Sequence, residues 1–205
     1  MDFAIFLQLL LSGLTAGCVY AMVALGFVLC MHVSGVINMA QGEYAMVGGV
    51  GTAVLSAHGV PLLLAVIGGV AVGGLLGALQ ERLTLAPVRS RGLFIRVTIT
   101  LGVAGVFRSL ALAAGGKDPL VLPGLSGDSA FELFGAILPI QTLWIWGATA
   151  TMLALVFWFL LRTPAGRAVR ACAENPMAAR LMGINVQRLS LLVLAGSGAL
   201  GALAG

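Results

Sequence analysis

Polar residues gather in one short segment of an otherwise apolar stretch, and they are the first candidates for chemistry. The segment 35–44 contains four polar side chains, Asn38, Gln41, Glu43 and Tyr44. Glu43 carries the one formal charge between Asp2 and Glu81. A carboxylate inside a long apolar stretch is costly unless it is paired, hydrated or protonated, so it marks a candidate functional site.

Two interpretations of this segment remain open. In the functional one, Gly35 and Gly42 flank an irregular or broken helix, of the kind that lines the substrate path of membrane transporters. Asn38, Gln41 and Glu43 then belong to the path, although on a regular helix Glu43 would point about 140° away from Asn38. In the structural one, Asn38 and Gln41 cap the start of a helix, and Glu43 pairs nearby or reaches toward water.

Arg108 is a second isolated charge, because it lies within another apolar stretch. It follows Arg96 by twelve residues, which is about 18 Å along a helix. Three placements are open: it faces a cavity, pairs with an acid such as Glu43, or reaches outward to the surface. Arg108 therefore joins Asn38, Gln41 and Glu43 as a candidate substrate-pathway residue.

The other polar cluster is the segment 162–188, which contains five arginines and a single acid. The pair Asn175–Pro176 divides it, because Pro cannot continue a helix interior and Asn before Pro suits the start of a new helix. We predict two short helices, over 165–173 and 176–182, with Gly183 ending the second. A short helix of this kind fits a groove on a partner protein.

The sequence contains no recognisable catalytic or metal-binding constellation. It has no phosphate-binding loop of the form G-x-x-x-x-G-K-[ST], so a separate subunit would have to supply any ATP hydrolysis. The three cysteines and two histidines lack metal-ligand spacing. We predict a non-catalytic chain without cofactor or metal, and the net charge of +4 does not require a nucleic-acid partner.

Composition identifies a lipid bilayer as the main solvent of this chain. Hydrophobic residues make up 60% and charged residues 9% of it, whereas soluble domains have roughly 25% charged residues. Since a span needs about 20 apolar residues, we predict an all-α polytopic transmembrane helix bundle with about six spans. The predicted spans are 3–30, 36–56, 62–80, 97–114, 141–161 and a sixth that begins near Leu189. Small residues within 68–77 and 197–205 predict close helix packing.

Loop charges predict the orientation of the bundle. Basic loops belong on the cytoplasmic side, and the loops 81–96 and 162–188 are both basic and lie two predicted spans apart. The loop 115–140 is acidic and falls on the opposite side, where we expect a folded external loop with a small hairpin. The N-terminus then also lies outside.

The sixth predicted span differs from the others at its end. Its final residues, SGALGALAG, have the character of a helix interior, and no polar anchor follows Gly205. We therefore expect residues 1–205 to form one transmembrane domain that is incomplete at its C-terminus.

Several of these residues together resemble a known family. Residues 178–185, AARLMGIN, are similar to the cytoplasmic loop of ATP-binding-cassette importer permeases, whose pattern begins Glu-Ala-Ala and reaches Gly four residues after the second Ala. Met177 stands where the Glu of that pattern would be.

The branched-chain amino acid permeases of the LivH/LivM type are the members that the chain resembles. The similar segments are 166–175, 181–185, 20–26 and 36–43. In the last of these, Met39 replaces the usual aromatic residue and Gln41 replaces a frequent His. The resemblance covers nearly the whole chain, 13–205.

The resemblance implies the permease subunit of an importer in a bacterial inner membrane. Such a subunit pairs with a second homologous permease, docks cytoplasmic ATP-binding subunits and receives solute from a periplasmic substrate-binding protein. Its cargo would be branched-chain amino acids or related solutes such as urea and short amides. The segment 162–188 would be the coupling loop, with the candidate coupling residues Arg167, Arg170, Glu174, Ala178, Ala179 and Gly183.

Two other classes of function compete with an importer subunit. An ion-coupled secondary transporter or channel, acting without an ATPase, would use Asn38, Glu43 and Arg108 for a proton or ion. A membrane-embedded enzyme would need a catalytic constellation that the sequence lacks. The segment 162–188 favours the importer subunit, because a stand-alone transporter has no evident use for a Pro-started, Gly-ended helix in a basic loop.

Overall fold

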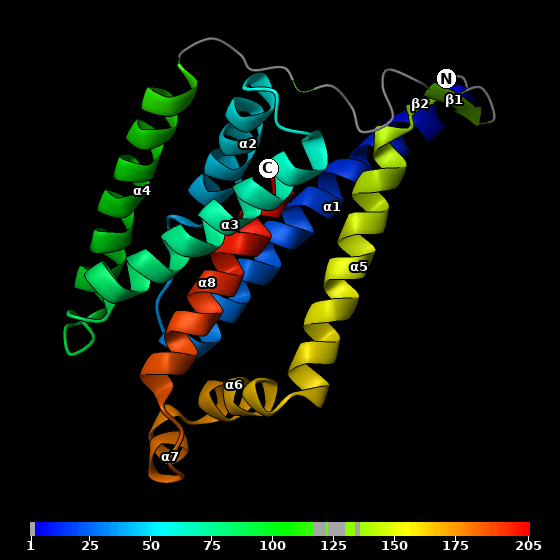
Figure 1. The fold of residues 1–205 in the computed structure, drawn as a ribbon. Helices are drawn as coiled ribbons and strands as arrows, with labels where there is room; N and C mark the ends of the chain where they lie inside the picture. Colours follow the sequence, from blue (N-terminus) through cyan, green and yellow to red (C-terminus); the bar gives the residue numbers. More distant parts are fainter. Residues whose placement is uncertain (1–2, 117–121, 123–129, 134–135) are drawn as a thin grey trace.

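The computed structural model describes residues 3–116, 122, 130–133 and 136–205, which are largely helical (Figure 1). The long helices are α1 (Phe3–Ser34), α2 (Gln41–Ala57), α3 (Leu62–Gln80), α4 (Leu93–Gly115), α5 (Gln141–Arg162) and α8 (Val186–Ala204). The short elements are the π-helical turn η1 (Glu81–Leu85), the helices α6 (Pro164–Glu174) and α7 (Pro176–Leu181), and the strands β1 (Ala130–Leu133) and β2 (Ala136–Pro139). The predicted all-α bundle is confirmed, and β1 and β2 form an antiparallel hairpin within the predicted external loop.

Within the part of the chain that the structure describes, five elements are long and apolar enough to cross a membrane: α1, α3 together with η1, α4, α5 and α8. The predicted span 36–56 is wrong at its start, because α2 begins at Gln41 and has 17 residues. Gly35 ends α1 with a positive φ of 63°, a conformation that Gly adopts without steric cost. The chain then runs to Gln41 without forming a helix, so the break expected beside Gly35 is present.

Two other boundaries differ from their predicted positions. Helix α4 begins at Leu93 rather than at residue 97, so Arg96 lies in its first turn. Helix α8 begins at Val186 rather than near Leu189, because Asn185 precedes it and its Oδ1 accepts a hydrogen bond from the Arg188 N–H at 3.1 Å. An Asn at this position satisfies one of the free N–H groups at a helix start.

Helices α3 and α8 pack at the centre of the bundle through their small residues. A Cβ added to Gly73 would lie 2.7 Å from the carbonyl oxygen of Gly198 on α8. A Cβ added to Gly69 would lie 2.8 Å from the carbonyl oxygen of Gly48 on α2. Neither position has room for a side chain, so the close packing predicted from these glycines is confirmed.

The two basic loops lie at one end of the bundle, opposite β1 and β2 (Figure 1). At this basic end, a buried apolar cluster joins α1, α6, α7 and α8; it contains Val33, Val169, Cys172, Ala179, Val186, Leu189 and Val193. The acidic character of the loop 115–140 depends largely on Asp118 and Asp128. Both of these residues, and Lys117, lie outside the described residues.

Candidate functional site

Asn38 lies in the non-helical segment between α1 and α2, and the end of α3 holds it there. Its Oδ1 accepts a hydrogen bond from Gln80 Nε2 at 2.8 Å and another from the Ala40 N–H at 3.2 Å. The Tyr44 hydroxyl donates to the Oε1 of the same glutamine. All three side chains are buried. Among the described residues, Asn38 Nδ2 has no partner.

Gln41 connects the first turn of α2 to α8 and α1. Its Nε2 donates to the Ser197 carbonyl oxygen at 3.2 Å, and its Oε1 lies 2.7 Å from the Ser197 hydroxyl. That hydroxyl is also 2.8 Å from the carbonyl oxygen of Gly26. The interpretation of Gln41 as a helix cap is wrong, since Ala40 occupies the cap position and no side chain caps α2.

The non-helical segment is also held from α4. The Met39 N–H donates to Thr100 Oγ1 at 3.1 Å, and Arg96 Nη1 donates to the carbonyl oxygen of Ser34 at 3.2 Å. Backbone groups that a helix would pair internally are thus paired with side chains of a neighbouring helix. The broken stretch is a defined conformation rather than an unpaired one.

Glu43 and Arg108 form an ion pair between α2 and α4. Arg108 Nη2 lies 2.6 Å from Glu43 Oε1, and the arginine side chain is 66% exposed against 12% for the glutamate. Of the three placements open for Arg108, pairing with Glu43 is the one found. Of the four candidate pathway residues, Asn38 and Gln41 lie in the interior of the chain, and only the Glu43–Arg108 pair reaches its surface.

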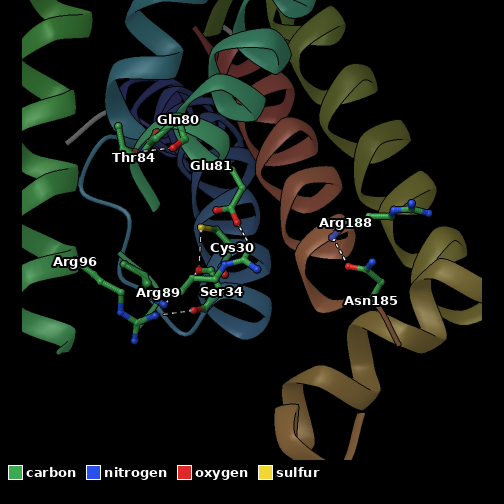
Figure 2. Close-up of polar contacts among 10 residues, drawn as sticks. Cys30, Ser34, Gln80, Glu81, Thr84, Arg89, Arg96, Asn185 and Arg188 are labelled. Carbon is green, nitrogen blue, oxygen red and sulfur yellow. Dashed lines mark hydrogen bonds and ion pairs between the residues drawn. The ribbon is translucent and has the colours of Figure 1, made fainter. Parts of the chain in front are cut away.

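A second ion pair, between Glu81 and Arg89, lies at the basic end and was not predicted from the sequence. Figure 2 shows Arg89 reaching back toward Glu81, beside Cys30 and Ser34 of α1. The Arg89 Nη2 pairs with Glu81 Oε1, and the glutamate side chain is only 2% exposed. Glu81 Oε2 has no partner among the described residues. The signal that could have predicted this pair is the position of Glu81, an acid at the start of the basic loop 81–96.

Helices α6 and α7 form as their end residues predict. Thr163 Oγ1 accepts from the Gly166 N–H at 3.0 Å at the start of α6. Asn175 Oδ1 accepts from the N–H groups of Met177 and Ala178, each at 3.0 Å, at the start of α7. Both caps are followed by Pro at the first helical position, which favours a helix start.

The end of α7 is a Schellman motif centred on Gly183. Gly183 has a φ of 82°, and its N–H donates to the Arg180 carbonyl oxygen at 3.0 Å. The Ile184 N–H donates to the Ala179 carbonyl oxygen at 3.1 Å. This pair of bonds is the pattern in which a left-handed Gly closes a helix. The predicted stop at Gly183 is confirmed, and α7 ends at Leu181, one residue earlier than predicted.

The candidate coupling residues differ in their exposure. Five of them are exposed: Arg167, Arg170, Glu174, Ala178 and Gly183. Ala179 is instead buried in the apolar cluster of the basic end, where it fixes α7 against α6 and α8. The exposed apolar side chains of this region were not predicted; they are Met177, Leu181 and Met182, at 67%, 83% and 83% exposure.

Long apolar helices interrupted by a buried, non-helical segment define the chain as a multi-pass membrane protein of the transport class. A small capped helix with an exposed apolar surface at one end adds a means of contacting a partner. The family model "Branched-chain amino acid transport system / permease component" matches residues 9–205, and the chain belongs to this family. It is a membrane-spanning permease subunit of an ATP-binding-cassette importer, a class that works with ATP-binding subunits and substrate-binding proteins.

The relatives of this chain are permease proteins whose names give different substrates. LivH of Salmonella typhimurium, a high-affinity branched-chain amino acid transport system permease protein, is 32% identical over 218 residues, which cover 100% of this chain and 70% of the relative. BraD of Pseudomonas aeruginosa, of the same description, is 29% identical over 97% of this chain and 69% of its own length. The D-allose transport system permease protein AlsC of Escherichia coli is 33% identical over 91% of this chain and 55% of its own length. No solved structure matches the chain.

Proposed function

We propose that this permease carries branched-chain amino acids, or a related small polar solute, across a bacterial inner membrane. It does so paired with a second homologous permease, with solute delivered by a periplasmic substrate-binding protein. The family match over residues 9–205 carries this proposal, and the names of LivH and BraD supply the substrate class. Transport of leucine by the assembled complex in vesicles, dependent on ATP and on the binding protein, is the direct test.

The docking element for the ATP-binding subunit is α7, within the coupling loop 162–188. Its support is the exposed apolar surface of Met177, Leu181 and Met182 on a helix that is capped at both ends. Exposed apolar side chains gain about 1.5–3 kcal/mol each when they are fully buried against a partner. Gly183 and Ala179 act by holding α7 in position, whereas Arg167, Arg170 and Glu174 lie on α6 beside it.

Replacing Leu181 tests the docking role of α7. Leu181→Ser, combined with Met182→Ser, should reduce co-purification of the ATP-binding subunit at least tenfold, which corresponds to about 1.4 kcal/mol. Leu83→Ser is the matched control, because Leu83 is 64% exposed on η1 but lies outside α7. Unchanged docking in the double variant, with the protein still folded, would show that α7 is not part of the interface.

The Glu43–Arg108 pair lies on the solute pathway. A charged pair at membrane depth is stable against protein or water and costly against lipid tails, and Arg108 is 66% exposed on the surface of this chain. Glu43→Gln and Arg108→Gln should each lower the transport rate without lowering ATP-binding-subunit docking. Exchange of the two charges should restore part of the lost transport, and Ser109→Ala on the same helix is the control.

The competing function is transport without an ATPase, since the same ion pair has the chemistry to bind a proton or ion. Solute flux driven by an ion gradient alone, in vesicles that lack the ATP-binding subunit, would support that alternative. Flux that appears only when the ATP-binding subunit and ATP are both supplied excludes it.

A further inference from the structure

A cavity of about 560 Å³ lies at the basic end, beside α7. Arg89 and Ser90 line it from the loop between η1 and α4, Arg180 lines it from α7, and the start of α8 closes it with Asn185 and Gln187. The lining contains two arginines and no carboxylate among the described residues. Arg180 has no ion pair among the described residues.

The negative charge nearest to this lining is Glu81, and its carboxylate is buried away from the cavity. Glu81, the partner of Arg89, is 2% exposed, whereas the Arg89 side chain is 23% exposed. Figure 2 shows Glu81 on the interior side of Arg89, toward α1. The guanidinium of Arg89 therefore keeps N–H groups for an acceptor that enters from the cavity.

We infer that this cavity receives an acidic side chain of the ATP-binding subunit, a contact that rests on the proposed docking at α7. Arg180 lies on α7 next to Leu181, so a partner that covers Leu181 and Met182 also faces the cavity mouth. Two guanidinium groups present paired N–H donors, which match a carboxylate in shape and charge. The contact orients the partner and speeds its association, because complementary charges act over longer distances than apolar contacts.

The test is binding of the purified ATP-binding subunit to the full chain in nanodiscs of uncharged lipid, at low and at high salt. Arg180→Glu should weaken binding on the order of tenfold at low salt, and the loss should shrink at high salt because exposed charges are screened. Ser90→Glu, which adds a negative charge to the lining without touching the Glu81–Arg89 pair, should act in the same direction.

Arg188→Glu is the matched control. Arg188 is an exposed arginine in the first turn of α8 that does not line the cavity, and Figure 2 shows it pointing to the opposite side of α8 from Arg89. The Arg188→Glu variant should change binding by less than about threefold, the size expected for a charge outside the contact.

The possible results separate this inference from the docking proposal. If Arg180→Glu and Ser90→Glu bind like Arg188→Glu while Leu181→Ser with Met182→Ser abolishes binding, the acidic contact is refuted and α7 docking stands. If the α7 double variant binds normally, the docking proposal itself fails. If the Arg180→Glu effect appears only in nanodiscs with anionic lipid, the cavity takes a lipid headgroup instead, and the inferred protein contact is refuted.

Discussion

Removal of the Arg89 guanidinium should destabilise the chain far more than removal of a neighbouring arginine. In the Arg89→Ala variant, Glu81 loses its one charged partner while its side chain stays in a site that is 2% exposed. Its Oε2 already has no hydrogen-bond partner among the described residues. The carboxylate would then be left buried and uncompensated, which is costly.

The magnitude follows from this burial. Breaking a buried ion pair by removing one partner costs about 3–5 kcal/mol. We expect the low end, about 3 kcal/mol, because the Arg89 side chain is 23% exposed and water can enter where it stood. Glu81→Gln with Arg89→Ala removes both charges and should cost about 1 kcal/mol, as for a lost hydrogen bond. The double variant should therefore be about 2 kcal/mol more stable than Arg89→Ala alone, the sign of a coupled pair.

Thermal unfolding in lipid nanodiscs, followed by tryptophan fluorescence, measures these differences. A loss of about 3 kcal/mol corresponds to a fall in Tm of roughly 6–12 °C for a chain of this size. Arg91→Ala is the control, because Arg91 is exposed in the same loop and its loss should stay within about 0.5 kcal/mol. Equal Tm values for Arg89→Ala and Arg91→Ala would refute the structural role of the pair.

Three further predictions concern other parts of the fold. Asn175→Ala should destabilise the start of α7 by about 1 kcal/mol, seen as faster amide hydrogen exchange in α7 alone. Gly73→Val should lower the yield of folded protein, because the added side chain would meet the carbonyl oxygen of α8, whereas Gly102→Val, with open space around it, should not. Burial raises the pKa of the Cys172 thiol, so less of it is thiolate at neutral pH, and it should react with maleimide far more slowly than a cysteine at exposed Ala178. Equal labelling of the two would contradict the burial of Cys172.

Features that neighbouring residues encode were predictable from the sequence. The division of the basic loop at Asn175–Pro176 and the stop at Gly183 depend on backbone rules that act over a few residues. The structure contains both, with the helix ends placed within one residue. The start of α2 at Gln41 was harder to predict, because the break expected beside Gly35 does not show at which residue the helix resumes.

Contacts between distant residues were not predictable in the same way. One of the two interpretations left open for Gln41 made it a helix cap, yet its partner is Ser197, 156 positions away. Glu43 and Arg108, 65 positions apart, were linked as one of several alternatives, because isolated opposite charges in apolar surroundings have few other ways to be stabilised. The apolar surface of Met177 and Leu181 was missed, since a helix of six residues is too short for hydrophobic periodicity to indicate which side is buried.

The end of α3 contacts both the buried polar residues of the interior and an arginine of the basic end. Gln80 hydrogen-bonds Asn38 and Tyr44, and so holds the non-helical segment and the first turn of α2. The next residue, Glu81, begins the π-helical turn and pairs with Arg89, which lines the cavity beside α7. A π-helical turn is an uncommon and often functional departure from the α-helix. Gln80 and Glu81 are adjacent in the chain, so consecutive residues contact the non-helical segment and Arg89. The end of α3 therefore contacts both the non-helical segment between α1 and α2 and an arginine that lines the cavity beside the proposed docking surface.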